Sequence, residues 1–320
     1  MQSKAEVTRA RPALSIVAPV FKDSECIPEL VRRLKATLDG RGESYEIVLV
    51  DDGSDDNTVA VALAQQPACP ELRVVELAFN HGKAGALTAG AAHARGDCVI
   101  FMDPDLQDPP EAVPVLVDKV REGYDLVFTT RTEKHDSLLN RLLSAAFWRF
   151  LRTFTGLSLP EGLGTMRACS RPFIDRFLEY REANRFLEGM FVHTGLRQAV
   201  VQIPHHPRFA GVSKFDTRRK ISLAVTAVVS FSDVPLRLCM KAGALLLLLG
   251  FAGGLGLVIA RLFFMRFQMG WPSLIATMIA GFGLNLLSLG VVGLYVGNIY
   301  SEVKQRPVFS VRRVHEGTPT

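Results

Sequence analysis

Two carboxylates that stand one residue apart follow directly after an apolar run. Residues 99–102 are Val-Ile-Phe-Met, and Asp103 and Asp105 come next. Such a run predicts a buried strand, and open α/β sheets bind their ligands at the carboxyl ends of the strands. Carboxylate oxygens suit Mg²⁺ or Mn²⁺, held partly by the protein and partly by the phosphates of a substrate. We therefore predict that Asp103 and Asp105 hold a divalent metal ion.

Charged residues also follow other predicted strands. Asp51 and Asp52 come after the apolar run 45–50, and Arg131 comes after 125–129. Charged groups that converge on one edge of a parallel sheet suit a nucleotide diphosphate with its metal. The alternative for Asp51 and Asp52 is a capped turn before a helix, which already explains the polar residues that follow them. We expect Asp51 to contact a ligand, because its strand places it beside the other carboxylates.

Two loops carry cations. Lys83 lies in a small-residue loop that opens a helix, where it either approaches phosphate or is simply solvated. Arg208 and Lys214 lie in a glycine-containing loop, well placed to close over phosphates near a membrane surface. The neighbouring His205 and His206 suggest a metal ligand pair, but zinc sites need three or four ligands and none converges here by spacing.

Asp108 has a structural interpretation. Pro109 follows it, and Glu111 stands three residues further on. This pattern is typical of a capping box, in which the first residue caps a helix and the acidic residue bonds back to it. We therefore predict that Asp108 is a helix N-cap.

Strands that alternate with helices must position these residues. This alternation predicts a doubly wound, mostly parallel α/β sheet. The predicted strands are 14–18, 45–50, 72–77, 99–102 and 125–129. Past Arg131 the alternation stops. An apolar stripe over 138–154, with arginines on other faces, indicates a helix that either lies on anionic lipid or packs on protein.

The apolar excess of the chain is concentrated near its C-terminus. Of the 320 residues, 48% are hydrophobic, and no charged residue occurs in 242–260 or in 267–301. Each run supplies the roughly 20 apolar residues that cross a bilayer, so we predict two transmembrane helices. More basic residues flank the outer ends of this hairpin than its short connection, which predicts that both termini are cytoplasmic. The outer basic residues are Arg237, Lys241, Lys304, Arg306, Arg312 and Arg313.

The predicted organisation has five parts. Residues 1–12 form an N-terminal tail, and no cleavable signal peptide is expected, because this stretch carries Lys4, Arg9 and Arg11 and contains no apolar core segment. The others are a cytoplasmic catalytic domain (13–216), an amphipathic juxtamembrane region (217–238), the membrane hairpin (239–301) and a cytoplasmic tail (302–320) that is exposed from Arg306 on. The five cysteines show no Cys-x-x-Cys spacing, which argues against structural zinc and suits a reducing compartment.

Four stretches together resemble the polyprenyl-phosphate branch of the family-2 glycosyltransferases. They are residues 19–21, 50–54, 102–111 and 208–214. This branch includes dolichyl-phosphate mannose synthases, undecaprenyl-phosphate glucosyltransferases and undecaprenyl-phosphate aminoarabinose transferases. The resemblance covers nearly the whole chain, including the two membrane helices. It implies a nucleotide-sugar-binding fold of the GT-A type.

The resemblance also implies roles for residues that match the motifs of the family. Pro19, Phe21 and Asp23 match the loop that holds the base of the donor, where the family usually has Tyr and Glu at the last two positions. Asp51 matches a nucleoside contact, and Gln107 matches a neighbouring donor contact. The implied catalytic groups are the metal and diphosphate pair, Asp103 and Asp105, with the phosphate-binding cations Arg208 and Lys214. Arg131 matches a further phosphate-binding cation and is implied to bind the donor.

The implied reaction transfers a sugar from a UDP- or GDP-linked donor to polyprenyl phosphate, with Mg²⁺ or Mn²⁺ and with inversion. Some relatives have Gly-Asp-Phe-Arg with a proposed basic Asp, whereas this chain has Thr165 at that position. A general base is dispensable, because the second pKa of a phosphate monoester is near 6 and the acceptor is largely a dianion at neutral pH.

The implied location is the inner membrane of the cell, with the lipid bilayer as a partner. A homo-oligomer is expected, since apolar helices need lipid or protein partners, and no nucleic-acid partner is expected. Two other functions stay open. One is a processive polysaccharide synthase, disfavoured because there are only two spans and no Gln-x-x-Arg-Trp motif. The other is a catalytically silent scaffold that binds sugar nucleotides, suggested by Thr165.

Overall fold

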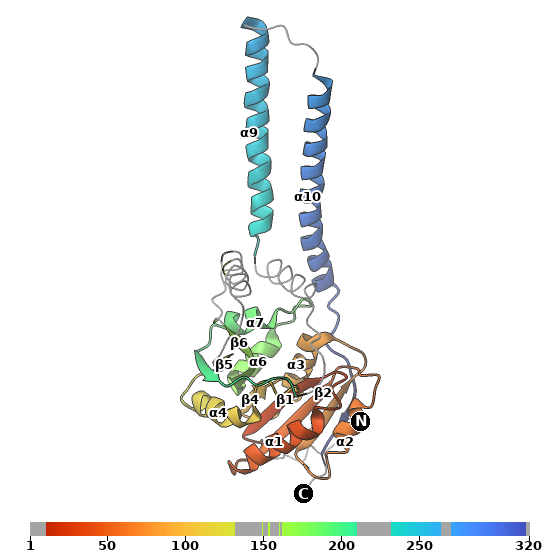
Figure 1. Ribbon diagram of the computed structural model, residues 1–320, viewed down its shortest axis with the longest axis vertical. Helices are drawn as coiled ribbons and strands as arrows, with labels where there is room; N and C mark the ends of the chain where they lie inside the picture. The colour runs from red at the N-terminus through yellow and green to blue at the C-terminus, as the bar shows by residue number, and fades with distance from the viewer. Residues whose placement is uncertain are drawn as a thin grey trace, which may run out of the picture.

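The structure is a computed structural model that describes residues 11–131, 149, 153, 160, 162–209, 232–263 and 270–317. An α/β domain carries a sheet with helices on both faces, and two long helices extend from it (Figure 1). The strands are β1 (Leu14–Val20), β2 (Tyr45–Asp51), β3 (Leu72–Leu77), β4 (Cys98–Phe101), β5 (Leu126–Arg131), β6 (Leu163–Ser170), β7 (Gln198–Ile203) and β8 (Val311–His315). The helices are α1 (Ile27–Asp39), α2 (Thr58–Leu63), α3 (Gly82–His93), α4 (Val113–Arg121) after the 3-10 turn η1 (Pro110–Ala112), α6 (Arg171–Glu179), α7 (Leu187–His193), α9 (Val234–Phe263) and α10 (Trp271–Val303).

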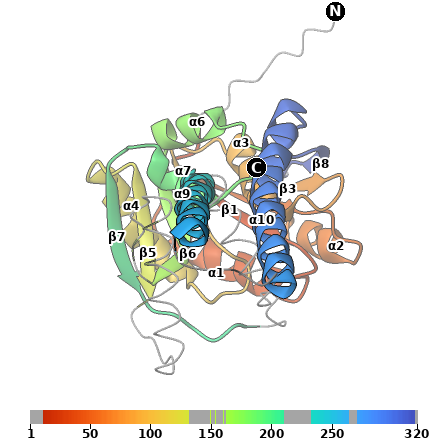
Figure 2. The same cartoon turned by 90° about the horizontal axis from the view of Figure 1, so that it is seen from above.

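The sheet has the strand order β7-β5-β6-β4-β1-β2-β3-β8. Strands β1 to β4 are parallel, β5 pairs in parallel with β7, and β6 runs antiparallel between β4 and β5. The prediction of a doubly wound, mostly parallel sheet is therefore confirmed. In Figure 2 strands β7 and β8 lie at opposite sides of the sheet.

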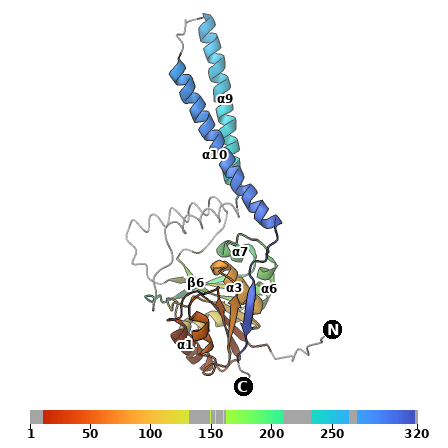
Figure 3. The same cartoon turned by 90° about the vertical axis from the view of Figure 1, so that its right-hand side faces the viewer.

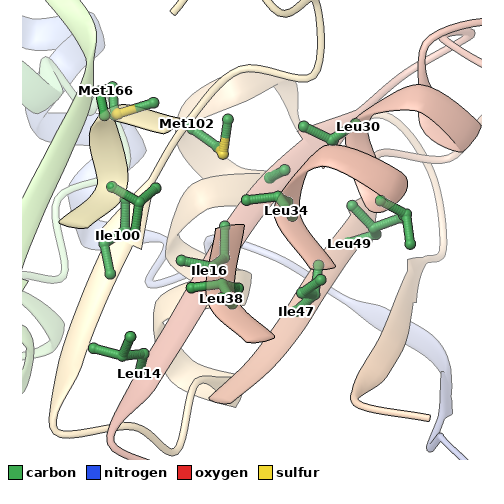
Figure 4. Packing of buried hydrophobic residues seen from close by; sticks show 14 of the residues in the cluster. Leu14, Ile16, Leu30, Leu34, Leu38, Ile47, Leu49, Ile100, Met102 and Met166 are labelled. Atoms are coloured by element: carbon green, nitrogen blue, oxygen red, sulfur yellow. The ribbon is translucent and has the colours of Figure 1, made fainter. Parts of the chain in front are cut away.

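Alternate residues of the central strands supply two hydrophobic cores. On one face, Leu14 and Ile16 pack with Leu30 and Leu34 of α1 (Figure 4). Helix α4 contributes buried residues to the same core. On the other face, Val17 packs with residues of α3, α6 and α7. The side chains of Leu14, Ile16, Val17, Leu30 and Leu34 are all fully buried. The period of two along each strand therefore fixes which residues face which helix layer.

Helices α9 and α10 form a hairpin that projects away from the α/β domain (Figures 1 and 3). Both are long and apolar enough to cross a membrane, and the most apolar stretch of each helix has no buried residue. Large side chains such as Phe251 and Leu286 are 75% and 69% exposed. Unpaired apolar surface of this extent marks contact with a membrane or a protein. Helix α9 begins at Val234, so the predicted juxtamembrane region already enters this helix.

The lower end of α10 is bonded to the α/β domain. The Ala183 amide donates to Glu302 Oε1 at 2.8 Å, and Asn184 Nδ2 donates to Asn298 Oδ1 at 2.7 Å. The Tyr295 hydroxyl donates to the Ser232 carbonyl, near the start of α9, at 2.6 Å. These bonds fix the position of the domain relative to the hairpin.

The prediction of an exposed tail from Arg306 on is wrong for residues 311–315, which form strand β8. Strand β8 pairs antiparallel with β3 and completes the edge of the sheet (Figures 2 and 3). Glu316 receives bonds from Arg73 at 2.9 and 3.1 Å and from Arg95 at 2.9 and 3.3 Å. The short segment Val-Arg-Arg-Val-His shows little hydrophobic alternation, so its strand character depends on the edge of β3 that it covers.

Most of the predicted amphipathic stripe over 138–154, and residues 217–231 of the juxtamembrane region, lie outside the described residues. The two interpretations of the stripe therefore stay predictions.

Candidate active site

The predicted metal pair lies in the loop that follows β4, at the carboxyl edge of the parallel strands. The Met102 amide donates to the Val17 carbonyl at 3.1 Å, which continues the ladder to the loop. Leu106 then adopts a positive φ of 58° with a side chain that is 2% exposed. This conformation costs a non-glycine residue about 1–3 kcal/mol and persists only where packing imposes it. The buried Leu106 thus fixes the turn that carries Asp103 and Asp105.

Asp103 is paired with Lys83. The Lys83 ammonium lies 2.6 Å from Asp103 Oδ1 and 2.7 Å from Oδ2. Lys83 belongs to the first turn of α3, which begins at Gly82 with a φ of 77°. Of the two alternatives for Lys83, the structure supports a position in the site, next to the predicted metal ligand.

Asp105 is paired with Arg208. Arg208 Nη2 lies 2.9 Å from Asp105 Oδ2, and the Gln107 amide donates to Oδ1 at 3.2 Å. Burial raises the pKa of Asp105, and the nearby Asp103 carboxylate raises it further, while Arg208 acts in the opposite direction. A cation at this carboxylate therefore relieves an unfavourable buried charge.

The segment that carries Arg208 is bonded along the Asp105 loop. The His206 amide donates to the Gln107 carbonyl at 2.9 Å, and the Phe209 amide donates to the Asp105 carbonyl at 3.2 Å. Although about 100 residues separate these segments in the chain, the bonds place Arg208 directly over the carboxylates. His205 and His206 take part in this attachment, and no described group of three or more His, Cys, Asp or Glu side chains forms a metal site.

The prediction that Asp108 caps a helix is wrong. The N-cap position of the following turn belongs to Pro109, without a side-chain bond. Asp108 Oδ2 instead accepts from the Thr165 hydroxyl at 2.7 Å and from the amides of Thr165 and Met166 at 3.1 and 3.0 Å. His205 Nδ1 lies 3.4 Å from its other oxygen. The carboxylate is 2% exposed and therefore holds β6 and the His205 segment against the metal loop.

This arrangement gives Thr165 a structural role that can be measured. Thr165→Val is expected to lower the free energy of unfolding by about 1–3 kcal/mol, because the buried Asp108 loses a donor. Thr165→Ser keeps the hydroxyl and is expected to remain within about 1 kcal/mol of the wild type. Denaturant unfolding of the detergent-solubilised proteins measures both. Equal stability of the valine and serine variants would contradict the role of the hydroxyl.

Asp51 is the last residue of β2, and its two carboxylate oxygens differ in their surroundings. Oδ2 accepts from the Ser54 amide at 3.1 Å, whereas Oδ1 is buried and accepts no hydrogen bond from the described part of the chain. Buried carboxylate oxygens are normally bonded, so this atom suits an N–H donor of a ligand. Burial raises the pKa of Asp51. Asp52, in contrast, accepts from the His81 amide at 2.7 Å and ties two loops together.

The predicted base-binding loop follows β1, next to β2. Pro19 lies in β1, opposite Val50 in the register of the two strands. Asp23 Oδ2 accepts from the Phe21 amide at 3.2 Å, which closes a tight turn. The Lys22 amide donates to the Ser54 hydroxyl at 3.0 Å and joins this turn to the loop of Asp51. Pro19, Phe21 and Asp23 are thus brought to the end of the sheet that holds Asp51.

The side chains of two other predicted cations lie outside the described part of the structure. Arg131 is the last residue of β5, and Lys214 lies outside the described residues.

The pairings of Lys83 and Asp108 were not predicted, since their partners Asp103 and Thr165 are 20 and 57 residues away. The one sequence signal for Lys83 was its place at the start of a helix.

The residues of the loop fit a divalent ion that shares its ligands with a substrate. Asp103 and Asp105 offer carboxylate oxygens on side chains that are 22% and 11% exposed. Two carboxylates leave most positions of an octahedral ion to phosphate and water, which is the usual arrangement for Mg²⁺.

The fold is a mostly parallel α/β sheet with a carboxylate pair at the carboxyl edge of its strands, where such sheets bind their ligands. The sequence profile described as glycosyl transferase family 2 matches residues 15–179. The chain belongs to glycosyl transferase family 2.

Relatives match over nearly the full length of the chain. An undecaprenyl-phosphate 4-deoxy-4-formamido-L-arabinose transferase of Klebsiella pneumoniae is 36% identical over 94% of this chain and 93% of its own. A bactoprenol glucosyl transferase, derived from prophage SfII in Shigella flexneri, is 33% identical over 96% and 99%. YkcC of Bacillus subtilis, an uncharacterized glycosyltransferase, is 33% identical over 93% of both chains.

Among solved structures, a glucosyl-3-phosphoglycerate synthase of Mycobacterium tuberculosis, in complex with Mn²⁺, UDP and glucosyl-3-phosphoglycerate, is similar. It is 22% identical, with a TM-score of 0.47, over 68% of this chain and 78% of that one.

Proposed function

We propose that this chain transfers a sugar from a nucleotide-sugar to polyprenyl phosphate at the cytoplasmic face of a membrane. The observation that carries the proposal is the carboxylate pair Asp103 and Asp105 with the cations Lys83 and Arg208, in a domain bonded to an apolar helix hairpin. The relatives named as undecaprenyl-phosphate and bactoprenol transferases support this substrate class. The hairpin keeps the domain at the surface where a lipid phosphate is presented.

The residues of the site suggest how the transfer proceeds. Asp103 and Asp105 would hold a divalent ion, which would supply positive charge to stabilise the leaving nucleotide diphosphate. Arg208 and Lys83 are placed to neutralise the phosphates beside the carboxylates, and Asp51 Oδ1 accepts an N–H of the base. The lipid phosphate oxygen forms a bond to the anomeric carbon as the bond to the diphosphate oxygen breaks. One direct displacement inverts the anomeric centre, and the dianionic phosphate releases no proton.

Transfer of radiolabel from UDP- and GDP-sugars to undecaprenyl phosphate tests the proposal. Purified protein with Mg²⁺ or Mn²⁺ is expected to produce a labelled lipid that mild acid releases and that EDTA abolishes. Binding of a sugar nucleotide without any labelled lipid would instead support the silent scaffold. The labelled donor also identifies the sugar and the nucleoside.

The position of Asp51 gives the donor affinity a defined pH dependence. Because burial raises the pKa of Asp51, the carboxylate becomes protonated at a higher pH than the ordinary aspartate value of about 3.9. A protonated Oδ1 no longer accepts a base N–H, so nucleotide binding is expected to weaken as the pH falls through the raised pKa. Calorimetric titration with UDP and with GDP from neutral to acidic pH measures the effect.

The variant Asp51→Asn provides the control for this titration. Phosphate groups of the nucleotide also titrate in acid, so only the difference between the wild type and Asp51→Asn reports on Asp51. The variant is expected to bind about tenfold more weakly at neutral pH, as for one lost charge-assisted hydrogen bond. Its affinity is expected to approach that of the wild type in acid. A constant ratio of the two affinities at every pH would contradict the assignment.

A further inference from the structure

All four oxygens of the predicted metal pair already accept from donors of the chain itself. Lys83 covers both oxygens of Asp103 at 2.6 and 2.7 Å. Arg208 Nη2 and the Gln107 amide occupy the two oxygens of Asp105 at 2.9 and 3.2 Å. Two carboxylates and two cations sum to zero charge, so the pair is locally neutral without a metal ion.

A divalent ion competes with Lys83 for the same atoms. Mg²⁺ needs oxygens at about 2.0–2.1 Å, and an ammonium that stayed on both oxygens of Asp103 would lie almost in contact with the ion. The Lys83 ammonium and a divalent ion would repel each other strongly, because the site is partly buried. Lys83 must therefore leave at least one oxygen of Asp103 before a metal binds there.

The donor supplies a place for the displaced cations. A metal ion alone adds two positive charges to a neutral cluster, whereas the diphosphate of a nucleotide-sugar carries two negative charges and restores neutrality. Lys83 stands in the first turn of α3, whose amino end favours anions, and its side chain is 44% exposed and has room to move. The planar guanidinium of Arg208 matches phosphate oxygens as well as carboxylate oxygens.

We propose that Lys83 and Arg208 are exchangeable counter-ions that make metal binding depend on the donor. They neutralise Asp103 and Asp105 when no nucleotide is bound and pass to the diphosphate when metal and donor bind together. The site then takes up a metal ion only with its substrate. This inference rests on the proposed function, because it assumes that a nucleotide diphosphate is the ligand.

Titration of the full-length protein with MnCl₂, followed by the EPR signal of free Mn²⁺, tests the proposal. Without nucleotide, Lys83→Met is expected to bind Mn²⁺ about tenfold more tightly than the wild type, because one competing charge is gone. UDP, or GDP in a parallel series, is expected to tighten Mn²⁺ binding strongly in the wild type and much less in the variant. By thermodynamic linkage, Mn²⁺ must enhance nucleotide binding by the same factor by which the nucleotide enhances Mn²⁺ binding. This factor is therefore also expected to be smaller in Lys83→Met than in the wild type.

Lys119→Met is the matched control, since Lys119 forms a similar ion pair with Glu122 at 2.6 Å but on α4. It is expected to bind Mn²⁺ as the wild type does. Lys83→Gln repeats the test with a polar side chain, and circular dichroism checks that each variant is folded. Unchanged Mn²⁺ affinity of both folded Lys83 variants without nucleotide overturns the inference, even if UDP or GDP still binds. A wild type that binds neither nucleotide overturns the proposed function itself.

Discussion

Replacing Asp105 by asparagine is expected to lower sugar transfer to undecaprenyl phosphate about 1,000-fold, because loss of a metal ligand removes several kcal/mol of charge stabilisation. Asp103→Asn is expected to have a similar effect. Both carboxylates lie in the loop that Leu106 fixes by its strained turn. The measurement is the initial rate of labelled lipid formation in membranes that contain equal amounts of each protein.

The control for this pair is Asp118→Asn, on α4. Asp118 pairs with Arg41 at the surface, and its side chain is 60% exposed. This variant is expected to retain the wild-type rate. Full transfer by the double variant Asp103→Asn, Asp105→Asn would contradict the metal assignment, whichever donor is used.

Replacing Arg73 by methionine is expected to destabilise the α/β domain by about 3–5 kcal/mol, since removal of one partner leaves a buried charge without compensation. Arg73 Nη1 lies 2.7 Å from Glu46 Oε2, and both side chains are 7% exposed. Arg73 also donates to Glu316 beyond β8 and to the His93 carbonyl. The melting temperature is expected to fall by about 10 °C for a domain of this size.

Two further variants separate the buried charge from general effects. Arg32→Met removes an exposed ion pair with Glu29 and is expected to cost at most about 1 kcal/mol. Adding Glu46→Met to Arg73→Met removes the unpaired charge and is expected to restore part of the lost stability. Thermal unfolding in detergent gives the stabilities of Arg32→Met, Arg73→Met and the double variant. A double variant less stable than Arg73→Met would show that Glu46 stabilises the fold through its bonds to Ser15 and Arg95.

The segment after α10 connects this buried pair to the apolar helix hairpin. Glu316 bonds to Arg73 and Arg95 at the edge of the sheet, and the Ser310 amide donates to His81 Nε2 at 3.1 Å. His81 precedes α3, the helix that carries Lys83. The segment that leaves the hairpin is thus a structural part of the catalytic domain, next to the helix whose first turn enters the site.

Local sequence patterns determined the central part of this fold. Apolar runs separated by helical segments predicted β1 to β5, and the long uncharged runs near the C-terminus predicted α9 and α10. The same strands predicted that Asp51, Asp103 and Asp105 lie at one edge of the sheet, because parallel strands bring their carboxyl ends together. Strands β6 to β8 were missed because polar residues occupy one or both faces of each, so none of them forms a continuous apolar run.

Only the tertiary structure decided how the charges of the site are paired. Asp108 fits a helix cap by its local neighbours, yet three donors from β6 reach it across 57 residues and outweigh that local preference. Lys83 and Arg208 meet Asp103 and Asp105 because α3 begins, and β7 ends, at the same edge of the sheet. Short-range periodicity records which residues are buried. The partner of a buried charge is set by which chain segments the packed sheet brings together.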